Sequence, residues 1–285
     1  MLKFEFTQVH MGVSVRLTLF APSRSQAFDA AKTAYERFAE LDAMMSDYQR
    51  SSELNRLCAQ SPGIPVPVSH DLFFVLLQAG RLSELTDGAF DITVGPIMKL
   101  WRAARKETRL PLDDELSEAR ARVGFRKVSL DPAARTVTLE TGSMQLDLGG
   151  IAKGYACEEA VKTLKKHGIS SAMVEAGGDI YVSEPPPGKD AWRISVLGWP
   201  NLVVNLKNEA VSTSGDAEQY VVIDGKRYSH IVDPHAGIGL TNLRQATVVA
   251  GSGWLTDALA TAFCVMSPEG SKALAAKIGA QIWIK

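Results

Sequence analysis

The feature that most constrains the fold of this chain is the irregular order in which strand and helix patterns follow one another. Residues 12–20 alternate apolar and polar side chains, which is the period of a half-buried strand. Residues 25–45 then carry apolar side chains at helical spacing. The predicted inner face of that helix consists of Phe28, Ala31, Tyr35, Phe38, Leu41 and Met45.

Further strand and helix patterns fill the rest of the sequence. Ser69 is placed to cap a helix with apolar residues from Leu72 to Leu82, and the charged residues 102–122 predict a surface loop with a short solvated helix. Asp224-Gly225, between two β-rich runs, is a strong signal for a hairpin. We also expect strands over residues 127–130, 136–140, 144–148, 172–175, 180–182, 192–196, 203–206, 245–250 and 281–284, and helices over 154–167, 255–266 and 268–278. Because these elements mix without strict alternation, we predict a single α+β domain over residues 1–285, with mixed or antiparallel sheets packed against helices.

Composition argues against several classes of function. The 31 Lys and Arg nearly balance the 32 Asp and Glu, so no overall positive field attracts nucleic acid. The three cysteines form no CxxC pair, which gives no support to a zinc or thioredoxin-type site. The longest apolar run, residues 72–77, is far shorter than the roughly 20 residues of a spanning helix. We expect a cytoplasmic protein, or a periplasmic or inner-membrane-associated one if an export segment precedes this sequence.

The densest block of functional residue types is DLGGIAKGYA, residues 147–156. It leads from a predicted strand across two glycines into a helix, and the backbone N–H groups of such a junction suit phosphate oxygens. Its spacing is neither that of a Walker A loop nor that of GxGxxG. A tight turn that needs glycine for its conformation is the alternative interpretation.

Asp257 and Thr261 lie four residues apart in a predicted helix and therefore share one face. A carboxylate and a hydroxyl are hard oxygen ligands of the kind that Mg²⁺ accepts. The alternative is structural: Thr256 would cap the helix, Asp257 would favour its dipole, and Thr261 would pack against its neighbours.

Three further segments combine polar side chains with turns or apolar surroundings. His230 follows the predicted hairpin and could serve as a general base toward a hydroxyl. The alternative is that its side chain is only hydrogen-bonded to the turn. The hydroxyls of residues 212–214 suit phosphate or sugar, and are also common at strand ends. Asp91 lies among apolar residues, so its carboxylate needs partners, which nearby backbone N–H groups could provide.

Taken together, these segments resemble the FAD:protein FMN transferase family, the ApbE-type flavin transferases. The matching segments, in the order of the family, are residues 10–17, 41–58, 88–101, 146–156, 176–182, 210–215, 228–237 and 256–263. They extend over nearly the whole chain, so the resemblance is not confined to one motif.

The resemblance implies an α+β fold, sandwich-like and related to the T-fold, around a flavin-binding cleft. It implies a Mg²⁺ site made of the backbone carbonyl of Gly150 with Asp257 and Thr261, and His230 as the base. Ala260 stands where some members carry an acidic residue, which predicts one carboxylate fewer at the metal. In the FAD site the resemblance places Met11, Tyr48, Ala89, Phe90, Asp91, Asp147, Lys153, Thr213 and Val232.

The resemblance also implies an activity with two alternatives. The family cleaves FAD and joins FMN to a Thr or Ser of an acceptor protein, in a motif resembling D-x-x-[ST]-G-A-[TS], with release of AMP. A Mg²⁺-dependent FAD pyrophosphatase would use the same residues with water as the nucleophile. A non-catalytic FAD-binding protein would release no AMP, and the predicted cation site argues against it.

Overall fold

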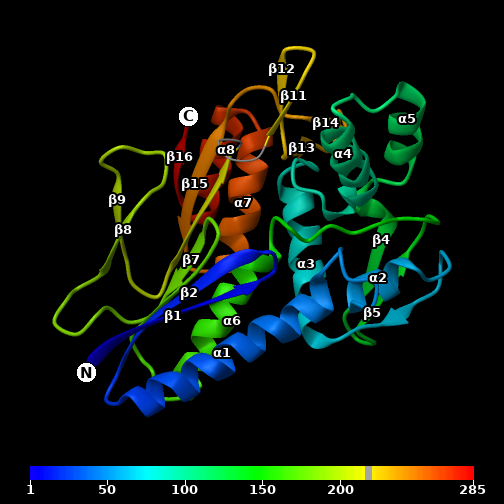
Figure 1. The fold of residues 1–285 in the computed structure, drawn as a ribbon. Helices are drawn as coiled ribbons and strands as arrows, with labels where there is room; N and C mark the ends of the chain where they lie inside the picture. The colour runs from blue at the N-terminus through cyan, green and yellow to red at the C-terminus, as the bar shows by residue number, and fades with distance from the viewer. Residues whose placement is uncertain (216–219) are drawn as a thin grey trace.

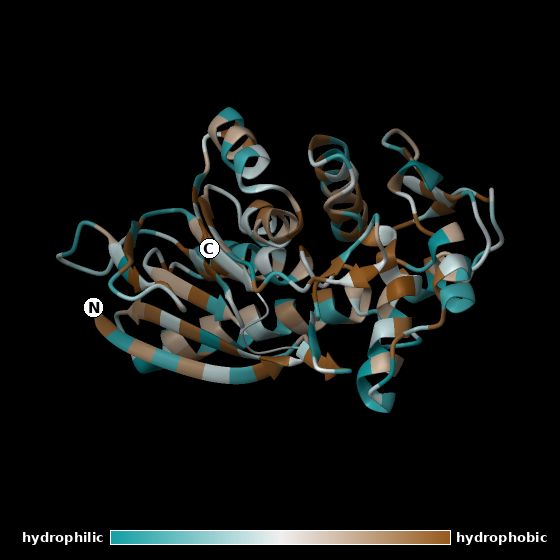
Figure 2. Ribbon diagram, turned by 90° about the horizontal axis from the view of Figure 1, so that it is seen from above, coloured by the Kyte–Doolittle hydropathy of each residue, from teal (hydrophilic) through white to brown (hydrophobic). Residues whose placement is uncertain are grey.

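The computed structural model describes residues 1–215 and 220–285, and its centre is a seven-stranded antiparallel sheet (Figure 1). The two chain ends lie at its two edges, because the first and last strands are the edge strands. In spatial order the strands are β1 (Leu2–His10), β2 (Val13–Ala21), β6 (Ala172–Ala176), β7 (Asp179–Val182), β10 (Ala210–Gly215), β15 (Gln245–Ala250) and β16 (Gln281–Ile284). Hydrophobic and hydrophilic residues alternate along β1, the strand that starts at the label N in Figure 2.

Three helices pack on one face of this sheet: α1 (Arg24–Met45), α6 (Ala152–Lys166) and α7 (Gly253–Val265). The face that α1 buries is mostly alanine in its first half, which lets the helix approach the sheet and α6 closely. Five of the six residues predicted for that inner face are buried, but the prediction for Phe28 is wrong. Phe28 is 58% exposed and meets the ring of Phe6 at the sheet edge, because Ala27, Ala30 and Ala31 take the inward positions.

The other face of the sheet is covered in part by the hairpin of β8 (Trp192–Ser195) and β9 (Val203–Leu206). Trp192 and Leu206 of this hairpin form a small apolar cluster with Val182, Val211 and Val249 of the sheet. Side chains of β10 therefore alternate between two environments, the α7 side and the β8–β9 side.

Most of the remaining elements lie beside the sheet, on the right in Figure 1, and the hairpin of β11 and β12 lies at the top. Helix α3 (His70–Leu85) begins at Ser69, whose hydroxyl accepts the Leu72 N–H as predicted. The other elements are α2 (Glu53–Cys58), η1 (Ile92–Val94), α4 (Gly95–Glu107), α5 (Asp113–Ala121), η2 (Phe125–Lys127), the three-stranded sheet of β3 (Val66–Pro67), β5 (Thr136–Leu139) and β4 (Val128–Asp131), and the hairpins β11 (Tyr220–Ile223) with β12 (Lys226–Ser229) and β13 (Val232–Asp233) with β14 (Ile238–Gly239). Helix α8 (Pro268–Ile278) packs against β16.

Two predictions in this part of the chain need correction. The start of the charged stretch 102–122 is not loop, because it continues helix α4, where Trp101 and Ala104 are buried. Residues 144–148 form no strand. Met144, Leu146 and Leu148 are buried in alternation, but the Asp147 N–H bonds to the carbonyl of Ile92 instead of a ladder partner. The glycine block therefore starts from an extended segment without strand pairing.

The Asp224-Gly225 hairpin is confirmed: both residues adopt positive φ, as a two-residue hairpin turn requires. All three cysteines are buried. Nowhere in residues 1–215 and 220–285 does a helix combine the length and the apolar character needed to cross a bilayer.

Candidate active site

The candidate site lies where the N-terminus of α6 meets α7, and two glycines set this contact. A Cβ atom on Gly154 would lie 2.1 Å from the carbonyl oxygen of Gly253, and a Cβ on Gly253 would lie equally close to the carbonyl oxygen of Gly154. Both obstacles are backbone atoms, so no side-chain movement would relieve them. Gly154 and Gly253 therefore let the two helices touch backbone to backbone.

An acidic side chain from each helix caps the first turn of the other. Asp257 Oδ2 of α7 accepts the Gly154 N–H at 3.0 Å, and Glu158 Oε2 of α6 accepts the Gly253 N–H at 2.9 Å. These N–H groups have no partner within their own helices. The negative charge of each carboxylate is also stabilised by the positive end of the helix dipole. The exchange holds the Asp257 carboxylate in a fixed orientation.

Lys153 and a second aspartate complete a buried charge cluster around Asp257. Lys153 Nζ lies 2.7 Å from the Gly149 carbonyl, 3.2 Å from Asp179 Oδ2 and 3.5 Å from Asp257 Oδ2. Burial, and after it the nearby Asp179 charge, raises the pKa of Asp257 to about 7, although Lys153 and the Gly154 N–H act in the opposite direction. The two carboxylates outweigh burial at the lysine and raise the pKa of Lys153, so its ammonium stays charged.

The residues predicted to hold the cation come together beside this cluster. Asp257 is 2% exposed, and both hydrogen bonds to its carboxylate fall on Oδ2, so Oδ1 has no such partner in the described ranges. Thr261 Oγ1 lies 3.0 Å from the position of a Cβ on Gly150, and Ser214 Oγ is 3.3 Å from Thr261 Oγ1. Carboxylate, hydroxyl and carbonyl oxygens are the donor set for a small hard cation, so these residues fit Mg²⁺.

The structural alternative for Thr256 is wrong. Helix α7 begins at Gly253, so Thr256 lies inside it, and its hydroxyl bonds to Ser212 and to the Gly253 carbonyl.

Strand alternation places Ser214, one of the three hydroxyl residues predicted to suit phosphate or sugar, on the α7 side of β10. Ser212 and Ser214 meet Thr256 and Thr261 of α7, respectively. Thr213, the residue predicted for the FAD site, has its hydroxyl on the opposite side, 2.9 Å from that of Thr247. Its contact with FAD stays a prediction. The signal for Ser214 was present in the period of two along residues 210–215.

Arg102 of α4 joins Asp147 to the Tyr48 segment. Its guanidinium lies 2.9 Å from Asp147 Oδ2 and 2.6 Å from Asp47 Oδ2, and it stacks over the ring of Tyr48. Asp147 Oδ1 accepts the Gly149 N–H at 2.9 Å and so shapes the glycine turn. Burial, followed by the Asp47 charge, raises the pKa of Asp147. Tyr48 is 76% exposed, which leaves its ring accessible to a ligand.

The Ala89–Asp91 segment is buried against the glycine block. Asp91 Oδ1 accepts the backbone and side-chain donors of Thr93, and Oδ2 accepts the Phe125 N–H at 3.0 Å. The predicted alternative, a carboxylate held by nearby donors, therefore describes Asp91 in this structure. Phe90 contacts the Gly150 position, where a Cβ would lie 3.4 Å from its ring.

Three other residues predicted for the site are Met11, His230 and Val232. Met11 occupies the β1–β2 turn, which packs beside the Gly177–Gly178 turn that precedes Asp179. His230 and the buried Val232 lie between β12 and β14, in a segment fixed to α4 by the bond from Trp101 Nε1 to the Gly237 carbonyl. The contacts of Met11, His230 and Val232 with a substrate stay predictions.

The structure is therefore an antiparallel α+β fold in which Asp257, Thr261 and Gly150 lie beside a buried charge cluster. A family model described as the ApbE family matches residues 11–284. The chain is 34% identical over 247 residues to an FAD:protein FMN transferase of Vibrio cholerae, with 83% of this chain and 73% of the relative covered. It is 31% identical over 293 residues to the protein of that name from Treponema pallidum, with 95% and 81% covered.

Solved structures give the same result. The fold matches a crystal structure of the ApbE protein of Thermotoga maritima with a TM-score of 0.89 and 31% identity, over 99% of this chain and 94% of that one. It matches the flavin transferase ApbE of Vibrio cholerae with a TM-score of 0.88 and 30% identity, over 99% and 93%. The chain belongs to the ApbE family.

Proposed function

We propose that this chain is a Mg²⁺-dependent FAD:protein FMN transferase. Its relatives carry the name FAD:protein FMN transferase. The observation that carries the cation dependence is the buried Asp257 carboxylate, which lies one helical turn before Thr261 and is held through Oδ2 by the Gly154 N–H and by Lys153. A storage protein for FAD would need no such site.

In this proposal the chain's own residues bind, orient and move a proton. The Gly149–Gly150 turn and the Lys153 ammonium lie next to the phosphates of FAD, and Tyr48, Phe90 and Met11 bind the rest of the dinucleotide. Mg²⁺, held by Asp257, Thr261 and the Gly150 carbonyl, would neutralise phosphate charge as it develops on the leaving group.

The transfer joins an acceptor hydroxyl to the FMN half of FAD. The hydroxyl oxygen forms a bond to the FMN phosphorus, the pyrophosphate P–O bond breaks, and AMP leaves with the bridging oxygen. His230 accepts the hydroxyl proton. The acceptor is a protein with a Thr or Ser in a motif resembling D-x-x-[ST]-G-A-[TS].

The test of the cation site compares Asp257→Asn with Asp190→Asn, which removes an exposed carboxylate from the loop before β8. We expect Asp257→Asn to abolish Mg²⁺-dependent labelling of an acceptor, measured as flavin fluorescence of its band after denaturing electrophoresis. Asp190→Asn should label at the wild-type rate. Full activity of a folded Asp257→Asn variant would refute the assignment.

The same assay separates transferase from pyrophosphatase. With FAD and Mg²⁺, a transferase releases AMP in proportion to labelled acceptor, whereas rapid AMP release without acceptor identifies a hydrolase. We further expect His230→Asn to slow labelling by about 10²-fold or more while FAD affinity changes little. Equal losses of rate and affinity would mark His230 as a structural residue.

A further inference from the structure

Asp179 is a buried carboxylate with no role in the function proposed above. It is the first residue of β7 and is 3% exposed. Its position is fixed by two strands, since it pairs with Ala176 of β6 and with Ser212 of β10. Its side chain points to the N-terminus of α6, where Asp179 Oδ2 lies 3.2 Å from Lys153 Nζ.

The distances around Lys153 show an ammonium shared unequally between two carboxylates. Lys153 Nζ is closer to Asp179 Oδ2 than to Asp257 Oδ2, at 3.2 Å against 3.5 Å, and the Gly149 carbonyl at 2.7 Å holds it from a third side. Both contacts at the aspartates fall on a single oxygen of each. The lysine therefore neutralises about one of the two negative charges.

This charge count decides whether the site can take a cation. With one ammonium and two carboxylates, one negative charge is left over for a divalent ion. Without Asp179 the ammonium has Asp257 as its carboxylate, and the two would neutralise each other. A cation would then have to displace the lysine from Asp257, which is costly in a buried site.

We propose that Asp179 is a positioning residue that holds the Lys153 ammonium away from Asp257, so that Asp257 can bind a divalent cation. Asp179 acts through Lys153 and not by contact with the metal. This inference rests on the cation site of the proposed function.

The test measures cation binding by the FAD-free protein, with Mn²⁺ followed by electron paramagnetic resonance. We expect Asp179→Asn to lower Mn²⁺ affinity by about tenfold or more. In a Lys153→Met background, the same Asp179→Asn change should cost less than about threefold, because no ammonium is left to move onto Asp257. Thermal unfolding shows that each variant is folded.

The outcomes separate this inference from the proposed function. If wild type binds Mn²⁺ and Asp257→Asn abolishes that binding, the cation site itself is supported. If wild type does not bind Mn²⁺, both the cation site and the role of Asp179 are overturned. Equal losses from Asp179→Asn in the two backgrounds, or no loss in either, overturn the role of Asp179 alone. If Asp179→Asn does not fold, Lys153→Met decides: it should keep or raise Mn²⁺ affinity, and a fall would overturn the inference.

Discussion

Replacement of Gly154 by alanine should destabilise this protein, although alanine is the better helix former. The new Cβ would lie 2.1 Å from the Gly253 carbonyl oxygen and 2.8 Å from the Asp257 Cβ. The helices would have to separate by about 1 Å at this point, and overpacking of this kind costs about 3 kcal/mol. The higher helix propensity of alanine stabilises the folded state by at most about 1 kcal/mol. The net loss is about 2 kcal/mol, or a Tm lower by about 4 °C for a chain of this size.

Gly80→Ala is the matched control. Gly80 lies inside helix α3, and a Cβ there meets no atom within 4 Å. Only helix propensity changes, so we expect the free energy of unfolding to rise by up to about 1 kcal/mol and Tm to rise with it. The two substitutions are chemically identical, and the structure predicts opposite signs.

Thermal and urea unfolding of the two variants, compared with wild type, give the sign of each stability change. Gly154→Ala should also weaken Mn²⁺ binding, because separation of the helices lengthens the bond from the Gly154 N–H to Asp257 Oδ2. A Gly154→Ala protein that unfolds at or above the wild-type Tm would refute the claim that α6 and α7 touch through their backbones.

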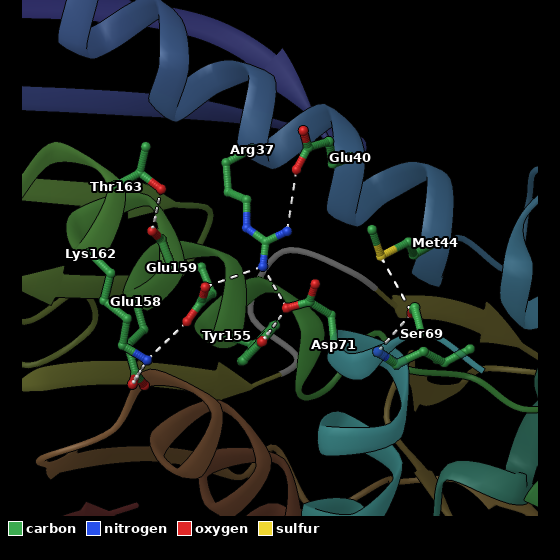
Figure 3. A network of polar contacts seen from close by, with 11 residues as sticks. Arg37, Glu40, Met44, Ser69, Asp71, Tyr155, Glu158, Glu159, Lys162 and Thr163 are labelled. Atoms are coloured by element: carbon green, nitrogen blue, oxygen red, sulfur yellow. Dashed lines mark hydrogen bonds and ion pairs between the residues drawn. The ribbon is translucent and has the colours of Figure 1, made fainter. Parts of the chain in front are cut away.

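Two further predictions concern carboxylates that are half-buried or buried. Arg37 links α1 to Asp71 of α3 and Glu159 of α6 (Figure 3), so Arg37→Met should cost about 2 kcal/mol in urea unfolding at pH 7. Burial would raise the pKa of Asp71, but the hydrogen bonds from Arg37 and Tyr155 lower it overall. This stability is therefore present above the unfolded pKa, near 4, and is lost as pH falls through the lower folded value, so the difference between variant and wild type should shrink in acid. A difference that stays constant down to pH 2–3 would contradict this reasoning. Asp91→Ala removes the acceptor of the Phe125 N–H, and should cost about 1–3 kcal/mol in the same assay; unchanged stability would show that water replaces the carboxylate.

The sequence by itself determined the local elements and the turns. Periods of two and of 3.6 depend on neighbouring residues alone, and they located β2, α1, α3 and most later elements. The Asp224-Gly225 turn was readable for the same reason, because positive φ is a property of the residues in the turn. The motifs that carry the family resemblance were also continuous segments.

Only the tertiary structure decided which residues of these elements meet. Phe28 is exposed because alanines take the inward side of α1, and in residues 144–148 the Asp147 N–H bonds to the Ile92 carbonyl outside any strand ladder. Ser214 faces Thr261 because β10 presents alternate side chains to α7. Such outcomes depend on packing partners that are distant in sequence.

The cluster at the site shows this limit most clearly. Asp257, Lys153 and Asp179 come from α7, α6 and β7, and no sequence pattern joins them. They meet because Gly154 and Gly253 allow two backbones to touch, so that each helix can supply a carboxylate to the other's first turn. Local sequence specifies which chemical groups are available. Close packing of the helices specifies which of these groups come into contact and form ion pairs.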